Sequence, residues 1–344
     1  MTRVVQISHP VHGRALARVE EPSLVLLNGV KSVYEAALEA IDTKKSLVEL
    51  LLAARSDTKL NYDEVYAGTS EWKLLPAFDC PGDPFRCLVA GTGLTHKNSA
   101  LNRQAMHAAT EGTKPTDSII MYEWGVANGF PDPGEIGVQP EWFYKGNGSV
   151  LRAHGETLEV PDFGDDGGEE PEIAGIYIVD RQGTPHRIGL ATGNEFSDHV
   201  MEKKNYLYLA PSKLRQCAIG PELVIGADFC DIKGTVRVSG VRASGVRVPE
   251  GEQVKWSADI RTGEQNMAHS LENLEYHHFK YPGHRLPLQA HVHFFGADAF
   301  SFGSKVLLEN NDLMTVHWEG QGRPLQNRLA VSAGTGRLIP IEQL

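Results

Sequence analysis

The chain has 344 residues, of which 41% are hydrophobic, which is enough to bury the core of one large domain with a smaller one beside it. Its formal net charge of −11 argues against nucleic acid and against an anionic membrane surface as partners. No apolar run approaches the roughly 18 residues of a transmembrane helix. The N-terminus lacks the apolar stretch of a signal peptide, and the four cysteines form no CxxC pair. These features predict a cytoplasmic protein with reduced thiols.

The first part of the chain combines short strand patterns with helix signals. A capping-box pattern beginning at Ser32 predicts a helix through about Ile41, and a second helix is expected at 46–54. A further strand is expected near Val65. Residues 1–70 are therefore predicted to form a small α+β domain. Its first strands are expected where β-forming runs are separated by turn residues, at 3–8, 17–21 and 23–27.

The rest of the chain, 71–344, reads as a second and mainly β domain. Its short β-forming runs follow one another at irregular spacing, with helical interruptions expected near 97–112 and 262–276. This pattern predicts an α+β, mainly β fold and not a βαβ array. The strand runs are CLVAGTG, WFYKG, SVLRA, IAGIYIV, RIGLATG, ELVIG, TVRVSGV, HVHFFG and LMTVHW.

Three glutamates form a candidate metal site. Glu170 and Glu172 lie two residues apart at the start of a strand run, so their side chains project from one face. Paired carboxylates in a partly buried place need a cation between them or a retained proton. Glu195 ends the next apolar run, which a hairpin would return beside the first. Three such oxygen ligands suit Mg²⁺, Mn²⁺ or Ca²⁺, although an isolated E-x-E more often marks a solvated strand edge.

The order of motifs around these glutamates is more specific than their spacing. Over about 85–330, that order resembles the fumarylacetoacetate hydrolase family. The matching elements are GTGLTHKNSA with His96, PEWFYKG with Lys145, Glu170-Pro171-Glu172, Asn194-Glu195-Phe196-Ser197, Lys213 ahead of Gly220-Pro221, and EGQGRPLQN ending at Asn327.

The resemblance implies a mixed β-sandwich roll with a small N-terminal domain, usually a homodimer. It also implies Mg²⁺ held by Glu170, Glu172 and Glu195. The chain departs from the hydrolase pattern, because Asp198-His199 lacks the family's arginine and Ala297 follows Gly296 where a hydrolase has threonine. The stretch YLYLAPSKLRQCAIGP is closer to the branch that dehydrates 2-keto-3-deoxy sugar acids.

A 2-keto acid can chelate one metal ion through its carboxylate and keto oxygens, and the metal then stabilises the enolate that forms when a C3 proton leaves. A dehydratase needs a base at C3 and a proton donor for the departing hydroxide. We expect Glu141, which shares strand parity with Lys145, to be the base. Lys213 is expected to neutralise charge or transfer a proton. His96 is expected to act as a catalytic or substrate-bonding group, and Lys145 and Ser197 to bind substrate.

Three functions stay open from the sequence. The first is Mg²⁺-dependent dehydration of a 2-keto-3-deoxy sugar acid, a pentonate, in pentose metabolism. The second is hydrolysis of a C–C bond in a 2,4-diketo acid, and the third is non-catalytic binding of a sugar acid. A zinc site at His291-Val-His293, near His277 and His278, is disfavoured because the spacing matches no HExxH or Cys/His pattern.

Overall fold

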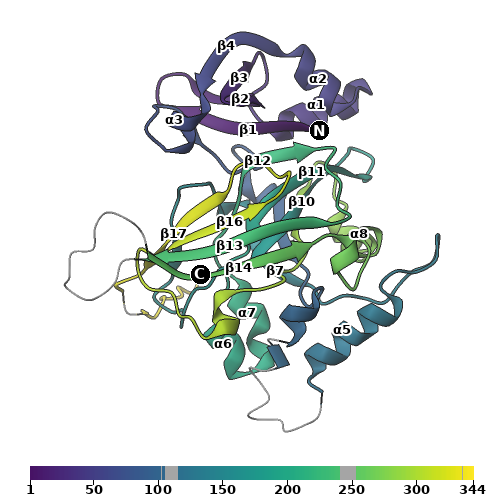
Figure 1. The fold of residues 1–344 in the computed structure, drawn as a ribbon. Helices are drawn as coiled ribbons and strands as arrows, with labels where there is room; N and C mark the ends of the chain where they lie inside the picture. Colours follow the sequence, from purple (N-terminus) through teal and green to yellow (C-terminus); the bar gives the residue numbers. More distant parts are fainter. Residues whose placement is uncertain (102, 105–114, 241–252, 335) are drawn as a thin grey trace.

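The computed structural model describes residues 1–101, 103, 104, 115–240, 253–334 and 336–344 (Figure 1). Among these residues, no helix has the length and apolar character needed to cross a membrane. The α-helices are α1 (Val33–Thr43), α2 (Leu47–Ala53), α3 (Tyr62–Tyr66), α5 (Asp117–Asn128), α6 (His199–Lys204), α7 (Leu209–Lys213) and α8 (Leu271–Phe279).

Strands dominate the architecture and form two sheets. They are β1 (Thr2–His9), β2 (Gly13–Glu20), β3 (Ser23–Leu27), β4 (Arg55–Asn61), β5 (Lys73–Leu74), β6 (Cys87–Gly91), β7 (Phe143–Asn147), β8 (Leu151–Arg152), β9 (Leu158–Val160), β10 (Pro171–Val179), β11 (Pro185–Asn194), β12 (Cys217–Ile225), β13 (Ile232–Gly240), β14 (Gln253–Thr262), β15 (Ala290–Phe294), β16 (Leu313–Trp318) and β17 (Leu325–Val331).

The larger sheet has the order β4-β3-β2-β1-β12-β11-β10-β15-β6-β7, with β5 beside β1 and β8 beside β12. The smaller sheet has the order β14-β13-β16-β17-β9. Both sheets are mixed, because β15 runs parallel to β6 and β17 runs parallel to β9, whereas most other neighbours are antiparallel. The fold is therefore α+β and mainly β, as the sequence predicted.

The N-terminal elements form the upper part of the molecule in Figure 1, and they extend the larger sheet through the antiparallel pairing of β1 with β12. The helix predicted from Ser32 is α1, and the Ser32 hydroxyl caps it by accepting from the backbone N–H of Glu35. The helix predicted at 46–54 is α2. A division of the chain after residue 70 stays a prediction, as does the homodimer, since the structure describes a single chain.

Some predicted elements differ from the structure. The strand expected near Val65 is wrong: this residue lies in α3, which Asn61 caps and which has acidic residues in its first turn. The helix expected at 262–276 is confined to α8 and the short 3₁₀ turn Glu264–Asn266. Residues 97–101 are helical, but the predicted helix at 97–112 runs on into residues outside the described ones.

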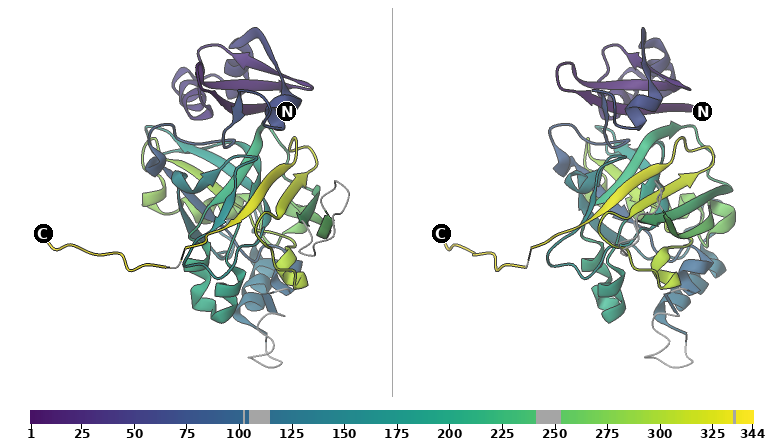
Figure 2. Two further views of the ribbon diagram at one scale, coloured as in Figure 1. Left: turned by 90° about the vertical axis from the view of Figure 1, so that its left-hand side faces the viewer. Right: turned by 60° about the vertical axis from the view of Figure 1, so that its left-hand side comes forward.

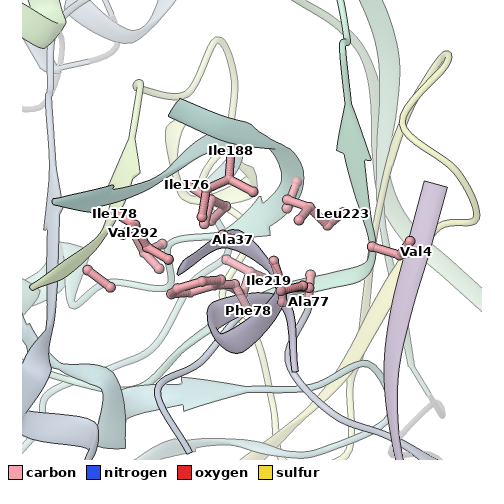
Figure 3. Packing of buried hydrophobic residues seen from close by; sticks show 14 of the residues in the cluster. Val4, Ala37, Ala77, Phe78, Ile176, Ile178, Ile188, Ile219, Leu223 and Val292 are labelled. Carbon is pink, nitrogen blue, oxygen red and sulfur yellow. The ribbon is translucent and has the colours of Figure 1, made fainter. Parts of the chain in front are cut away.

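The central strand β10 is buried along its whole length and has a separate core on each face. On one face, Ile176 and Ile178 pack against α1 and its neighbours, including Ala37 and Phe78, as Figure 3 shows. On the other face, Ile173 joins the core that lies between the two sheets and α8. Because both faces of β10 are covered, charged side chains at its start are also removed from water. The C-terminal segment after β17 runs away from this body (Figure 2).

Candidate metal centre

The hairpin of β10 and β11 brings the three glutamates together. In this antiparallel pair Pro171 lies opposite Asn194, so Glu195 returns beside Glu170. The backbone N–H of Glu195 donates to the carbonyl oxygen of Glu170 over 3.0 Å. One carboxylate oxygen from each of Glu170, Glu172 and Glu195 lies within 4.8 Å of the other two. The convergence that the hairpin predicted is therefore present.

All three carboxylates are shielded from solvent, with relative exposures of 6% for Glu170, 1% for Glu172 and 0% for Glu195. A solvated strand edge is thereby excluded for this E-x-E. Glu172 accepts from the backbone N–H of Gly296 over 2.7 Å. Gly296 has a φ of +98°, and a Cβ at this position would lie 2.1 Å from the Thr95 hydroxyl oxygen, so only glycine fits here.

Lys213 joins two of the glutamates. It lies at the end of α7, and its Nζ donates to both oxygens of Glu170 at 2.8 Å and to Glu195 Oε2 at 2.7 Å. It also contacts the Ser197 hydroxyl oxygen at 2.9 Å and lies 4.8 Å from the centre of the Phe143 ring. The structure thus places this lysine against two of the predicted metal ligands.

Lys145 and Ser197 also contact Glu195. The Lys145 ammonium donates to Glu195 Oε1, and to the carbonyl oxygens of Phe196 and Lys213 at 3.0 Å each. These three acceptors match the three N–H groups of a lysine. The Ser197 hydroxyl lies 3.0 Å from Glu195 Oε2. Both residues belong to the site, and their predicted role in substrate binding stays a prediction.

The three carboxylates differ in their electrostatics. Burial, together with the charges of Glu195 and Glu170, raises the pKa of Glu172 well above its ordinary value. Burial and the charge of Glu170 also raise the pKa of Glu195. Burial alone would raise the pKa of Glu170 too, but Lys213 and the hydrogen bond with His199 lower it well below its ordinary value.

These residues fit a divalent cation. Two lysines face the three glutamates, and among the described residues Glu172 forms no salt bridge of its own. A hard cation bound by oxygen ligands would relieve the repulsion that raises the pKa of Glu172 and Glu195. The donor set is entirely carboxylate, which matches the oxygen preference of Mg²⁺, Mn²⁺ and Ca²⁺.

Glu141 is buried next to this centre in a second ionic cluster. It precedes β7, and its carboxylate accepts from Arg103 Nη1 at 3.1 and 3.2 Å and from the Tyr206 hydroxyl at 3.0 Å. Arg103 Nε pairs with Glu202 at 2.7 Å. Burial opposes the raised pKa of Arg103, which the charges of Glu202 and Glu141 and, to a smaller extent, of Glu170 produce. The Glu141 cluster and the three glutamates are therefore electrostatic neighbours.

His96 does not touch the three glutamates. Its ring nitrogens lie 2.9 Å from the Thr95 hydroxyl and 3.1 Å from the Thr262 hydroxyl. Burial lowers the pKa of His96 to about 3, so the ring is neutral near pH 7. Its connection to the centre is indirect, since Thr95 also contacts the loop around Gly296. The predicted catalytic role of His96 stays a prediction.

The histidines His291 and His293 point into a separate buried cluster. His291 Nδ1 lies 2.9 Å from His278 Nε2, and His293 Nε2 lies 2.7 Å from the Thr92 hydroxyl. Among the described residues, the only group of His, Cys, Asp and Glu ligand atoms close enough to share a metal is the glutamate trio.

Several residues of the centre were not predicted. Arg103 and Tyr206 contact Glu141, Glu202 pairs with Arg103, and His199 lies 2.9 Å from Glu170 Oε1. Tyr206 lies in the YLYLAPSK run and His199 in the place of the family's arginine, so the sequence contained a signal for both. Arg103 and Glu202 lie in helical segments that have no recognisable motif.

Comparisons with known proteins identify the fold. No protein-family model matches the chain, and no curated protein sequence matches it. Solved structures do match. A hexagonal crystal form of 2-keto-3-deoxyarabinonate dehydratase has a TM-score of 0.70 at 16% identity, covering 96% of this chain and 100% of that chain.

Two further structures extend this result. 2-Keto-3-deoxy-D-arabinonate dehydratase complexed with magnesium and 2,5-dioxopentanoate has a TM-score of 0.68 at 17% identity, covering 96% of this chain and 99% of that chain. 2-Hydroxyhepta-2,4-diene-1,7-dioate isomerase from Mycobacterium marinum has a TM-score of 0.58 at 14% identity, covering 97% and 100%. The chain therefore has the fold of these enzymes along nearly its whole length, as the resemblance implied.

Proposed function

We propose that this protein is a hydro-lyase that removes water from a 2-keto-3-deoxy sugar acid, a pentonate, with the help of Mg²⁺. The observation that carries the proposal is the convergence of three buried glutamates, two of which share the ammonium of Lys213. The dehydratase that binds magnesium and 2,5-dioxopentanoate has the same fold, which supports this choice of reaction.

Glu170, Glu172 and Glu195 would hold the cation. When bound, it would supply Lewis-acid polarisation of the substrate's 2-keto group, which makes the C3 proton more acidic. Glu141 accepts that proton from C3, and Arg103 and Tyr206 keep its carboxylate oriented. The buried carboxylates of Glu170 and Glu195 oppose the effect of burial and raise the pKa of Lys213. This lysine therefore stays protonated and can neutralise developing negative charge on the substrate. The proton that Glu141 takes from C3 can pass to the departing C4 hydroxyl group, which leaves as water.

The two alternatives make different demands on the same residues. A hydrolase would use the centre to position an attacking water on a 2,4-diketo acid. A sugar-acid-binding protein would be favoured if Lys213 pointed away from the carboxylates, and its contacts with Glu170 and Glu195 argue against that alternative.

Product analysis separates the three functions. The protein is incubated with Mg²⁺ and either 2-keto-3-deoxypentonate or a 2,4-diketo acid, and the products are identified by mass. We expect the pentonate to lose one water and give a semialdehyde. Two carbon fragments from the diketo acid would contradict dehydration and favour hydrolysis. Tight binding of the pentonate without turnover would contradict both enzymes.

A further inference from the structure

We propose that His199 is a positioning residue that fixes the orientation of the Glu170 carboxylate for the cation. This inference rests on the proposed metal centre. His199 is the first residue of α6, and Asp198 caps this helix by accepting from the backbone N–H of Met201. The histidine is 1% exposed.

Among the described residues, the ring makes one polar contact. Its Nε2 lies 2.9 Å from Glu170 Oε1. An ionised carboxylate can only accept hydrogen bonds, so Nε2 carries the hydrogen and donates it. His199 Nδ1 has no hydrogen-bond partner among the described residues. The hydrogen bond that the ring donates therefore goes to one oxygen of one predicted metal ligand, Glu170.

Two phenylalanines hold the ring in its plane. The Phe300 ring is stacked on it with centroids 4.8 Å apart and planes 4° apart, and the Phe302 ring lies 5.2 Å away with planes 23° apart. Aromatic contacts at these distances restrict rotation of the imidazole. Ser301, between the two phenylalanines, donates its backbone N–H to Glu169 at 2.7 Å. The segment that clamps His199 is thus also tied to the residue before Glu170.

A glycine lets the ring approach the backbone. A Cβ on Gly168 would lie 2.6 Å from His199 Nδ1, closer than side-chain carbons are found. Gly168 and Ser197 exchange backbone hydrogen bonds of 3.0 Å, which joins the segments before Glu170 and after Glu195. The ring therefore lies in a slot formed by Gly168, Phe300 and Phe302, and this slot aims Nε2 at Glu170.

This arrangement serves metal binding more than general stability. His199 fixes Oε1 of the carboxylate, so Oε2, which also accepts from Lys213, can bind a cation with less loss of side-chain freedom. Loss of partners that orient metal ligands typically lowers metal affinity by about 10- to 100-fold. We therefore expect cation affinity to depend on the Nε2 donor even when the aromatic slot remains filled.

The test is a titration of the full chain with Mn²⁺, in which free ion is followed by its electron paramagnetic resonance signal. His199→Phe fills the slot but removes the donor, whereas His199→Gln places an amide N–H near the position of Nε2. We expect His199→Phe to weaken Mn²⁺ binding about tenfold or more, and His199→Gln to recover most of the loss. His154→Phe is the matched control, because this partly buried histidine stacks on Tyr66 and contacts none of the three glutamates.

The outcomes distinguish failure of the metal centre from failure of the positioning role of His199. Wild-type protein that binds no Mn²⁺ overturns the metal centre itself. Wild-type binding with equal affinity in His199→Phe overturns only the positioning role, as does a His199→Gln variant no better than His199→Phe. A His154→Phe variant as weak as His199→Phe also overturns it. If His199→Phe does not fold, Phe302→Leu loosens the slot with the donor in place, and unchanged Mn²⁺ affinity in that variant overturns the proposal.

Discussion

Glu141 is the residue on which the distinction between the proposed reactions depends most. It lies against Gly93, where a Cβ would be 1.8 Å from Glu141 Oε2. The absence of a side chain at residue 93 thus provides the space that the carboxylate occupies. Because the contact involves the end of a flexible side chain, an added methyl group would displace the carboxylate and leave the backbone in place.

Gly93→Ala is therefore expected to lower kcat for dehydration by about 100-fold, the typical contribution of a general base, and to lower stability as the displaced carboxylate separates from Arg103. The measurement is steady-state turnover of 2-keto-3-deoxypentonate, together with urea unfolding. Gly283→Ala is the control, since a Cβ there meets nothing within 4 Å. Equal turnover of Gly93→Ala and wild type would show that Glu141 is not the base.

At the residue scale, the sequence predicted the convergence of the three glutamates better than the contacts that support it. Glu170, Glu172 and Glu195 could be predicted because a two-residue period and a hairpin determine their approach. Arg103 and His199 reach the centre through tertiary contacts that no local period describes. The use of all three Lys145 N–H groups inside the site is also a tertiary property.

At the element scale, a histidine cluster joins α8 to β15. His278 of α8 contacts His291, and its ring lies 4.3 Å from that of His293. Trp142 donates to His278 Nδ1 over 3.1 Å, and His284 lies 4.9 Å from the His278 ring. Burial lowers the pKa of His291 and of His293 to about 3, and the pKa of His278 is also well below its ordinary value.

This cluster predicts a loss of stability in acid. Below the ordinary histidine pKa of 6.5, the unfolded chain binds protons that the folded cluster excludes. The contribution of these histidines to the free energy of unfolding is therefore fully present above pH 6.5. It decreases as the pH falls toward 3, by about 1.4 kcal/mol per pH unit for each such histidine. Urea unfolding at several pH values measures this slope. His291→Asn should have a shallower slope than wild type, and identical slopes would contradict this explanation.

Most strands could be predicted because their apolar runs are buried, as in β10 and β12. The sequence did not indicate β4, which reads RSDTKLN and is largely exposed, so its pairing with β3 stabilises it without an apolar pattern. The expected strand at Val65 failed for a different reason, since the cap provided by Asn61 favours a helical turn there.

At the scale of the whole molecule, the buried side chain of Glu222 in β12 links the N-terminal elements to the rest of the chain. It accepts from the Tyr62 hydroxyl of α3 at 2.9 Å and from the backbone N–H of Arg323 at 3.1 Å. It also pairs with Arg3 of β1 at 3.2 Å. Segments from three distant parts of the sequence thus meet at one buried carboxylate, an arrangement that sequence patterns do not describe.

Glu222→Ala should lower the free energy of unfolding by about 3 kcal/mol, because it leaves the buried Tyr62 hydroxyl without its acceptor and removes a buried partner of Arg3. Glu21→Ala is the matched control. Its carboxylate also pairs with an arginine, Arg323, but its side chain is 39% exposed, and we expect a loss below about 1 kcal/mol. Urea unfolding measures both values, and equal losses would contradict the linking role of Glu222.

The central claim is that Glu170, Glu172 and Glu195 hold a divalent cation. Glu172→Gln tests it most directly, because the amide keeps the shape of the side chain and removes its negative charge. Burial and the charges of Glu195 and Glu170 disfavour that negative charge unless a cation is bound. Glu275→Gln is the control, a partly buried carboxylate hydrogen-bonded to Tyr177 and Arg187 away from the centre.

The measurement is Mn²⁺ binding by titration calorimetry to the wild type and both variants. We expect one ion per chain in wild type and Glu275→Gln, and no detectable binding in a folded Glu172→Gln. Unchanged Mn²⁺ binding by Glu172→Gln would contradict the metal centre.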